Sequence, residues 1–435
     1  MHHWHLSLKN VSMTYIGLDM IQTAGIGALA LIVGMILTRR VAFLQRFCVP
    51  SPVSGGIIFS LITLVLYGWF GVEVSFDGTL KDVFMLAFFT SVGFQSNLKV
   101  LKQGGRLLVV MLTLLVVIIA MQDLMPMGIT RLMGVDPLIG MAAGSISMTG
   151  GHGTAAGFAS VLEGMGLNGA GTIGMAAATF GLIAGSMIGG PLAENIIRTK
   201  LTYEQTQQQD EEVDPAMAGI ESDEASPSGR AKRISTNEQE FQQYAKASYC
   251  IILVMAGGTI LSWLLAKTGI TFPTYFGALI LAAITRNTLG FISYKDDAGK
   301  RVKAEKMLDM ERIISVGNIS LSLFLGMAMI SLKLWELQSL ALPLIVILVS
   351  QVVMMGLFAF FVAFPLLGRD YDAAVLCAGI CGFGLGATPN AMANMSAVCY
   401  KYHYTVKPFL IVPIIGAMFA DLINTGIITI FLNIL

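Results

Sequence analysis

The segment SMTGGHGTAAGF, residues 147–158, places four glycines, three hydroxyl side chains and a histidine within twelve residues. Long apolar stretches lie on both sides of it. Inside a bilayer an unpaired backbone group costs several kcal/mol, so non-helical backbone is tolerated only where it is buried in protein or lines a wet cavity. The segment therefore predicts a break in the helical structure at membrane depth, with backbone amides and carbonyls open to a ligand.

The composition of the whole chain is that of a membrane protein. Of its 435 residues, 55% are hydrophobic and only 12% are charged, whereas a soluble domain carries about 25% charged residues. Lys and Arg balance Asp and Glu, so the chain has no overall basic field that would favour nucleic acid. We expect a polytopic protein surrounded by membrane lipids, with no nucleic-acid partner.

Ten apolar segments approach or exceed the length of about 20 residues that a spanning helix needs. They cover residues 19–38, 53–72, 83–98, 107–123, 168–197, 248–267, 272–292, 314–332, 338–367 and 404–434. Two further apolar segments, 136–162 and 371–398, are rich in Gly, Ser and Thr. We predict that each of these two is a re-entrant hairpin.

A polar segment divides the chain into two halves. Residues 199–246 begin with a charged run that is poor in large apolar side chains and cannot bury a core. We predict a flexible or weakly helical cytoplasmic linker there. It joins an N-terminal transmembrane unit, residues 1–198, to a C-terminal transmembrane unit, residues 247–435.

The distribution of Lys and Arg over the predicted loops gives an orientation. The loops on one side of the membrane carry 17 of these residues, and those on the other side carry 5. Because cytoplasmic loops are enriched in Lys and Arg, both termini are predicted outside, in the periplasm. The bias holds only if the hairpin at 136–162 enters from outside and the hairpin at 371–398 enters from inside.

The two halves also resemble each other. AGSISMTGG (143–151) aligns with AGICGFGLG (378–386), and GLIAGSMIG (181–189) aligns with GAMFADLIN (416–424), both at an offset of 235 residues. With five spans in each half, the second copy must be inserted upside down. The predicted fold is therefore all-α, with two inverted-topology repeats of five transmembrane helices, each carrying a re-entrant hairpin. Such repeats are typical of transporters that bind substrate near the membrane midplane.

The two hairpins carry the chemistry expected of a substrate site. Thr388 and Pro389 follow a glycine-rich stretch, as at a helix that restarts with Pro in its first turn. A free helix N-terminus favours an anion such as a carboxylate. An alternative is that the small residues only allow close helix packing. The predicted substrate-binding residues are Ser147, Thr149, Gly150, Gly151, His152, Gly153, Thr154, Gly386, Ala387, Thr388, Pro389, Asn390 and Asp421.

Asp421 and His152 are the most polar members of this set. Asp421 lies deep in the final span, within PIIGAMFADLINTGIITIFL (413–432), which has no other charge; a carboxylate there costs at least about 2.5–3.5 kcal/mol. It is predicted to face a cation or a substrate ammonium, and an ion pair with Arg286 is the alternative. His152 could bind substrate, carry a proton, or hold the shape of the hairpin as a neutral hydrogen-bonding residue.

Polar side chains in the third span and its counterpart, together with the hairpins, are candidate ligands for a small cation. Ser and Thr in helices also bond to their own backbone, so this assignment has a structural alternative. The predicted sodium-binding residues are Thr90, Ser91, Gln95, Asn318, Ser320, Gly384, Asn394 and Asn424. No other metal site is predicted.

The motifs GGHGT (150–154) and GFGLGATP (382–389), in paired hairpins, resemble those of the bacterial sodium/glutamate symporters. The resemblance covers nearly all the chain outside the linker and the extreme N-terminus. It implies import of L-glutamate across the inner membrane, with Na⁺ as the coupling ion and no cofactor. It also implies a homodimer in which hairpin-bearing domains move against a fixed scaffold, an elevator-like form of alternating access.

Two other functions remain open at this point. A sodium-coupled carrier of dicarboxylates or hydroxycarboxylates would share the architecture, but its substrate would lack an ammonium for Asp421. An ion channel or an intramembrane enzyme belongs to a different class. The sequence carries no evident nucleophile–base constellation, so we predict that the chain is not an enzyme.

Overall fold

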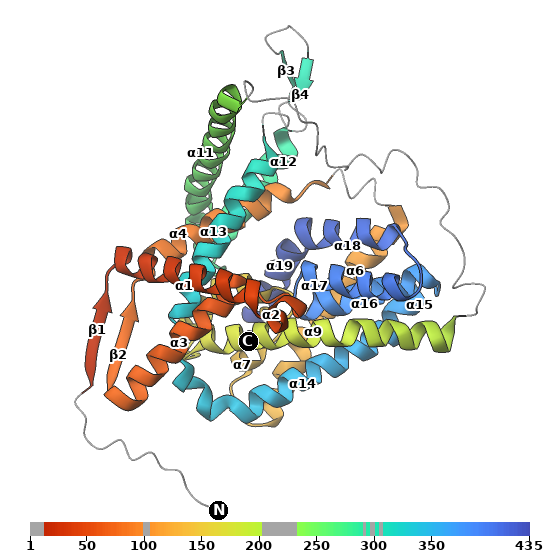
Figure 1. The fold of residues 1–435 in the computed structure, drawn as a ribbon, viewed down its shortest axis with the longest axis horizontal. Coiled ribbons are helices and arrows are strands. Elements are labelled where there is room, and N and C mark those ends of the chain that lie inside the picture. Colours follow the sequence, from red (N-terminus) through yellow and green to blue (C-terminus); the bar gives the residue numbers. More distant parts are fainter. Residues whose placement is uncertain (1–12, 99–104, 202–232, 290–292, 296–300, 304–307) are drawn as a thin grey trace, which may run out of the picture.

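The computed structural model describes residues 13–98, 105–201, 233–289, 293–295, 301–303 and 308–435. Most of the described chain is helical (Figure 1). The helices of the first half are α1 (Met20–Arg40), α2 (Ala42–Arg46), α3 (Ser51–Phe70), α4 (Thr79–Gln95), α6 (Gly105–Leu132), α7 (Pro137–Ala142), α8 (Gly151–Gly164) and α9 (Ala170–Lys200).

The second half contains the remaining helices. They are α11 (Arg233–Ala266), α12 (Phe276–Leu289), α13 (Met310–Ile330), the 3-10 helix η2 (Leu334–Leu340), α14 (Ala341–Phe358), the π-helical turn η3 (Ala359–Ala363), α15 (Phe364–Leu366), α16 (Tyr371–Leu385), α17 (Thr388–Lys401), α18 (Lys407–Met418) and α19 (Ala420–Leu432).

Two short strand pairs interrupt this helical architecture. Strand β1 (Thr14–Leu18) pairs in parallel with β2 (Val72–Phe76), and β3 (Ser293–Lys295) pairs antiparallel with β4 (Arg301–Lys303). They lie in connections outside the helical body (Figure 1). The predicted all-helical class therefore holds for the membrane-spanning elements, whereas the prediction missed these strands because hydropathy reports on spans and not on loops.

Seven of the described helices are long and apolar enough to cross a bilayer, or eight if α18 and α19 are counted as one bent span. Two shorter apolar helices, α12 and α16, fall below that length. The predicted final span, 404–434, is not one helix, because α18 and α19 meet at an angle of 50°. The polytopic helical class is thus confirmed, with seven to eight candidate spans.

The predicted linker, 199–246, is only partly described. Residues 202–232 and the N-terminal residues 1–12 lie outside the described part of the chain. Helix α11 begins at Arg233, inside the predicted linker, and its apolar part runs from Glu240 to Ala266. The second half of the chain therefore begins with a helix that is longer than its apolar stretch indicates.

The helices pack in two groups. In the first, called here the scaffold group, α4 packs on α12 and α13, α3 packs on α1 and α13, and α11 packs on α12. In the second, called here the hairpin group, α9 packs on α8, α14, α16 and α17, and α6 packs on α7, α14 and α19. The scaffold group occupies the left and upper left of Figure 1. Contacts of α8 with α13 and of α18 with α4 join the groups.

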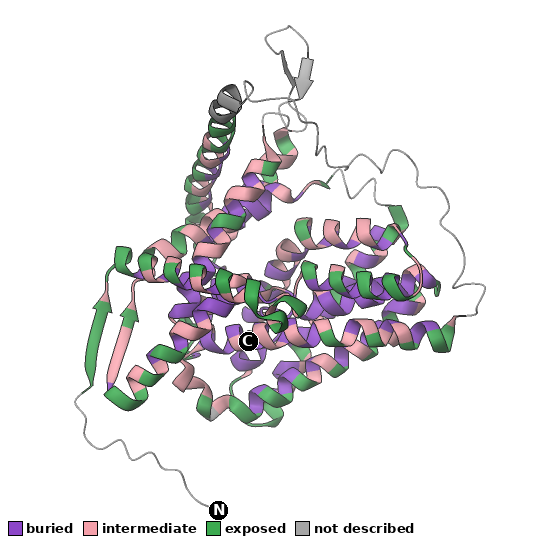
Figure 2. Cartoon of the chain, in the orientation of Figure 1, coloured by how far each residue is buried: buried purple, intermediate pink, exposed green. Residues whose placement is uncertain are grey.

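Burial distinguishes the hairpins from the lipid-facing helices. All but two residues of α16 are buried, and the exceptions are Asp372 and Phe383. In contrast, only 17% of the most apolar part of helix α11 is buried (Figure 2). Helix α16 is therefore enclosed by protein, which is the environment that a chain break at membrane depth requires.

Candidate functional site

The two predicted hairpins meet at their tips. In the first hairpin α8 starts at Gly151, whose φ of +61° lies in the left-handed region that favours glycine. In the second, α16 ends at Leu385 and α17 starts at Thr388. A Cβ at Gly151 would lie 3.4 Å from the carbonyl oxygen of Gly386. The N-termini of α8 and α17 both lack a side-chain cap, so their first amides are open near this junction.

Gln122 of α6 connects the two tips. Its side-chain Nε2 donates a hydrogen bond to the Gly384 carbonyl, at 2.5 Å, and its Oε1 accepts one from Thr149 Oγ1, at 2.6 Å. Gln351 of α14 in turn donates to the Gln122 carbonyl oxygen at 2.8 Å. All of these groups are buried. The sequence analysis missed both glutamines, whose only signal is an amide side chain inside an apolar helix.

Asp123, the next residue along α6, holds the turn of the first hairpin. It is fully buried, and its carboxylate accepts hydrogen bonds from the backbone N–H of Ser145 at 2.8 Å and from the Ser145 hydroxyl at 2.9 Å. The predicted span, 107–123, ended at this residue, and Asp123 was not among the predicted site residues. Because α6 continues to Leu132, Asp123 is an ionisable group within a transmembrane helix, a feature that would have identified it.

Asn390 and Asn394 attach the second hairpin to α9. The Asn390 amide donates to the Leu182 carbonyl at 3.0 Å and contacts the Ser186 hydroxyl at 2.5 Å. The Asn394 amide donates to the Gly185 carbonyl at 2.8 Å. The hairpin of the second half is therefore bound to a helix of the first half.

Asn424 makes the reciprocal attachment. From α19 it donates to the Ser145 carbonyl in the turn of the first hairpin, at 3.2 Å. Three buried oxygens in this region, Oδ1 of Asn424, Oδ1 of Asn390 and Oγ1 of Thr154, have no hydrogen-bond partner in the described chain. An unsatisfied buried acceptor costs about 1–3 kcal/mol. Hard cations bind preferentially to oxygen atoms. The three oxygens are therefore suited to bind a cation.

Asp421 lies in the first turn of α19, directly after the bend that separates it from α18. It is half-buried, and it forms no hydrogen bond or ion pair within the described residues. The alternative pairing with Arg286 is therefore not present in this structure. The Asp421 carboxylate is available for a cationic group.

His152 lies at the start of α8 and is buried. Its Nε2 is 3.0 Å from Thr179 Oγ1, and the Thr179 hydroxyl itself donates to the Met175 carbonyl at 2.8 Å. The hydroxyl hydrogen of Thr179 is already used in its bond to Met175. The Nε2 atom of His152 is therefore the donor in the contact with Thr179. This contact fixes the orientation of the His152 ring at the tip, and the three roles considered for His152 stay predictions.

The remaining residues of the first hairpin have structural contacts. The Ser147 hydroxyl bonds to the carbonyls of Ala142 and Gly174. The Gly150 amide donates to the Ser145 carbonyl at 2.9 Å. A Cβ at Gly153 would lie 3.4 Å from the ring of Phe88, so this glycine faces the scaffold group.

The residues between α16 and α17, and the first turn of α17, are partly exposed. Ala387 is extended, and its amide donates to the Gly382 carbonyl at 3.1 Å. Thr388 is half-buried, and Pro389 is exposed in the first turn of α17. The predicted helix restart with proline is therefore found where the sequence places it.

The predicted sodium ligands separate into two sets. The hydroxyls of Thr90, Ser91 and Ser320 donate to carbonyls of their own helices at 2.7–2.9 Å. Gln95 bonds weakly to its own helix at 3.4 Å, and Asn318 is exposed. The other set lies on the hairpins and α19: Gly384 is at the junction of the tips, Asn424 bonds to the turn of the first hairpin, and Asn394 lies further along α17, against α9.

Comparison with known proteins agrees with these motifs. A family model described as sodium/glutamate symporter matches residues 16–404, which include both hairpins. The chain is 39% identical over 421 residues to the sodium/glutamate symporter of Escherichia coli (strain K12), which covers 95% of this chain and 98% of that protein. It is 37% identical over 408 residues to the sodium/glutamate symporter of Haemophilus influenzae (strain ATCC 51907 / DSM 11121 / KW20 / Rd), covering 94% and 95%.

These matches are to transporters, which confirms the prediction that the chain is not an enzyme. They extend over nearly the whole chain and nearly the whole of each relative. With its two glycine-rich hairpins and this extended similarity, the chain belongs to the sodium/glutamate symporter family.

Proposed function

We propose that the protein is a multi-pass symporter that imports L-glutamate into the bacterial cell by coupling it to Na⁺. The family and the names of its relatives support the two solutes. The observation that carries the proposal within this chain is the meeting of two uncapped helix N-termini beside buried oxygens that lack partners. Such a site offers separate groups for an anion and for a cation.

The substrate lies at the junction of the hairpin tips. The first amides of α8 and α17 are oriented for carboxylates, since a helix N-terminus binds anions. Asp421 receives the substrate ammonium, and its lack of an ion pair within the described residues supports this role. The surrounding predicted set, from Ser147 to Thr154 and from Gly386 to Asn390, shapes the pocket around those groups.

Sodium ions bind beside the substrate and couple to it. The buried oxygens of Thr154, Asn390 and Asn424 support cation binding at the tips, because each lacks a hydrogen-bond partner in the described chain. A bound cation neutralises the negative charge of the substrate. An empty or half-loaded site, with its polar groups uncompensated, crosses the membrane less readily, which couples the two solutes.

The transport cycle is alternating access by movement of the hairpin group against the scaffold group. The limited set of contacts between the groups supports such a movement. The reciprocal packing of α3 on α13 and of α12 on α4 supports two inverted repeats of five spans. The protein works as a homodimer, with both termini outside and the linker in the cytoplasm.

The test is uptake of labelled L-glutamate into proteoliposomes that contain the purified full chain. An inward Na⁺ gradient is expected to drive accumulation above that obtained with an equal K⁺ gradient, because only sodium is coupled. Equal uptake under the two gradients would contradict sodium coupling. Competition by unlabelled aspartate, malate and citrate separates the proposal from the dicarboxylate alternative: strong competition by malate and citrate contradicts a site that requires an ammonium.

A further inference from the structure

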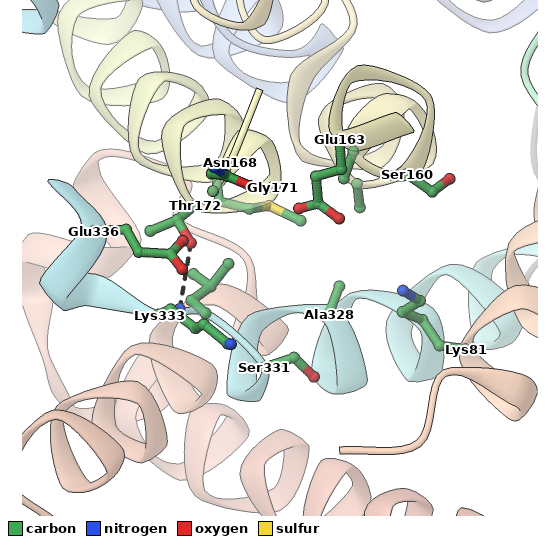
Figure 3. Close-up of a pocket in the computed structure, with 15 residues that line it drawn as sticks. Lys81, Ser160, Glu163, Asn168, Gly171, Thr172, Ala328, Ser331, Lys333 and Glu336 are labelled. Atoms are coloured by element: carbon green, nitrogen blue, oxygen red, sulfur yellow. Dashed lines mark hydrogen bonds between the residues drawn. The ribbon is translucent and has the colours of Figure 1, made fainter. Parts of the chain in front are cut away.

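A polar cavity lies between the two helix groups, beside the site at the tips. It has a volume of about 430 Å³, within the range of about 300–1,000 Å³ that is common for small-molecule sites. Figure 3 shows that its walls come from α8 and α9 on one side and from α13 and the residues that follow it on the other. Nothing in the proposed function assigns a role to this cavity.

Four charged side chains of both signs line the cavity. Lys81 and Lys333 supply ammonium groups, and Glu163 and Glu336 supply carboxylates. Figure 3 shows the Glu163 carboxylate reaching into the cavity from α8, opposite the wall that carries Lys333. A purely anionic or purely cationic ligand would leave one pair of these charges without a partner, whereas a zwitterion satisfies both.

The charges in the cavity are only partly compensated by each other. Lys333 Nζ is 2.9 Å from Glu73 Oε1, while Lys81 makes only a loose contact with Asp82, at 3.8 Å. Neither Glu163 nor Glu336 forms an ion pair with another described residue. Burial raises the pKa of Glu336, as do the nearby Glu163 and Glu73 carboxylates, while Lys333 lowers it. Because neither carboxylate has an ion-pair partner among the described residues, each is available to a substrate ammonium.

The cavity ends close to the tips. Ala156 and Met175 belong to its lining, and His152 and Thr179 lie four residues from them along α8 and α9. Four residues make about one helical turn, or roughly 5.4–6 Å. The His152–Thr179 contact therefore lies about one turn beyond the inner end of the cavity, between it and the site at the tips.

We propose that this cavity is a capture site for an acidic amino acid, which the protein binds before the ligand passes His152 and reaches the tips. The two lysines hold its two carboxylates, and Glu163 and Glu336 hold its ammonium. The inference rests on the proposed function, because the tips are taken as the destination. In the predicted orientation the cavity opens to the periplasm, the side from which the substrate enters.

The test measures initial rates of sodium-driven L-glutamate uptake in proteoliposomes for Lys81→Met and Glu163→Gln. Each substitution removes one charge from the cavity, which weakens substrate binding there but does not change the substrate site at the hairpin tips. We expect KM to rise by about tenfold while Vmax stays at the wild-type value, which is the pattern of lost binding that does not affect turnover. Added choline chloride is expected to raise the wild-type KM and to have little effect on the variants, since salt screens exposed charges.

Matched controls separate charge in the cavity from charge elsewhere. Lys267 packs over the ring of Trp263, and Glu311 is exposed beside Arg312; neither Lys267 nor Glu311 lines the cavity. Lys267→Met and Glu311→Gln are expected to keep the wild-type KM. The charge-preserving variants Lys81→Arg and Glu163→Asp are expected to restore most of the affinity.

Three results would overturn the capture site. They are an unchanged KM in both neutral variants, a lower Vmax with an unchanged KM, and an equal rise of KM in the charge-preserving variants. Failure of the proposed function has a different signature, because wild-type uptake would then not depend on the sodium gradient. A sodium-dependent wild type with unaffected variants contradicts the capture site alone.

Discussion

Two carboxylates inside the membrane-spanning helices of this protein have opposite surroundings. Asp123 accepts two hydrogen bonds from Ser145 in the turn of the first hairpin. Asp421 has no hydrogen bond or ion pair in the described part of the chain. Burying a carboxylate at membrane depth costs at least about 2.5–3.5 kcal/mol. At the residue scale, Asp123 therefore stabilises the hairpin, whereas Asp421 is an unpaired charge that a substrate can satisfy.

Asp421→Asn is expected to abolish sodium-driven glutamate uptake and to leave the folded protein as stable as the wild type, or more so. The substitution removes an unpaired charge while it keeps the side-chain shape. Uptake in proteoliposomes and thermal unfolding of the protein in detergent measure the two effects. Normal transport by this variant would remove Asp421 from the substrate site.

Asp123→Ala serves as the opposite control. It leaves the Ser145 N–H and hydroxyl without their buried acceptor, at a cost of about 1–3 kcal/mol. Its midpoint of thermal unfolding is expected to fall, in contrast to that of Asp421→Asn. If both variants unfold at the same temperature, the hydrogen bonds of Asp123 do not hold the hairpin.

At the scale of the element, the two hairpin tips depend on close approach of backbone. Gly151 begins α8 with a φ of +61°, and it faces the carbonyl of Gly386 in the other hairpin. A left-handed conformation costs an L-residue roughly 1–2 kcal/mol, and a new methyl group would lie where the tips meet. The glycine therefore combines a backbone requirement with a packing requirement.

Gly151→Ala is expected to lower the uptake rate by about tenfold, the change that corresponds to about 1.4 kcal/mol. Gly164→Ala is the matched control in the same helix, because a Cβ there meets no other atom within 4 Å. It is expected to transport normally. Equal rates for Gly151→Ala and Gly164→Ala would show that the tip tolerates a side chain.

The sequence predicts these elements unevenly. The hairpins follow from local composition, since glycines and hydroxyls stand out in an apolar chain, and the proline restart at Thr388 is found as predicted. The bend at Phe419 was not predicted, because the apolar residues on both sides of Asp421 were assigned to one span, 404–434. Gln122 and Asp123 were missed because their roles depend on contacts with Gly384 and Ser145, which lie far along the chain or across the bundle.

At the scale of the whole molecule, the helices form two groups with a charged cavity between them. Each half of the chain contributes helices to both groups, so neither half packs as a separate body. The scaffold group takes α4 and α13, while the hairpin group takes both hairpins. Transport by movement of one group against the other requires this cavity to change shape in every cycle.

Cross-linking the two groups is therefore expected to stop uptake. Cysteines placed at Ala159 of α8 and Ala328 of α13, both in the cavity lining, are joined by a cleavable bifunctional reagent in a chain whose native cysteines are replaced by alanine. Uptake in proteoliposomes is expected to fall on cross-linking and to recover on cleavage.

A pair within one group provides the control. Gly17 and Ser75 are direct partners in the β1–β2 pair, and linking them by the same reagent is expected to leave uptake unchanged. Full activity of the cross-linked Ala159–Ala328 pair would contradict movement of the groups at this cavity.

The movement proposed for the hairpin group would be limited by the 3-10 helix η2. Helix η2 follows residues 331–333, and its Trp335 stacks on Tyr67 of α3 with the ring centroids 4.0 Å apart, so one end is anchored to the scaffold group while the other leads into α14. Its 7 residues span roughly 14 Å as a 3-10 helix and about 23 Å when fully extended. Full extension of η2 would therefore lengthen this connection by about 9 Å. A longer displacement of the hairpin group requires Trp335 to separate from Tyr67 or the first turn of α14 to unwind.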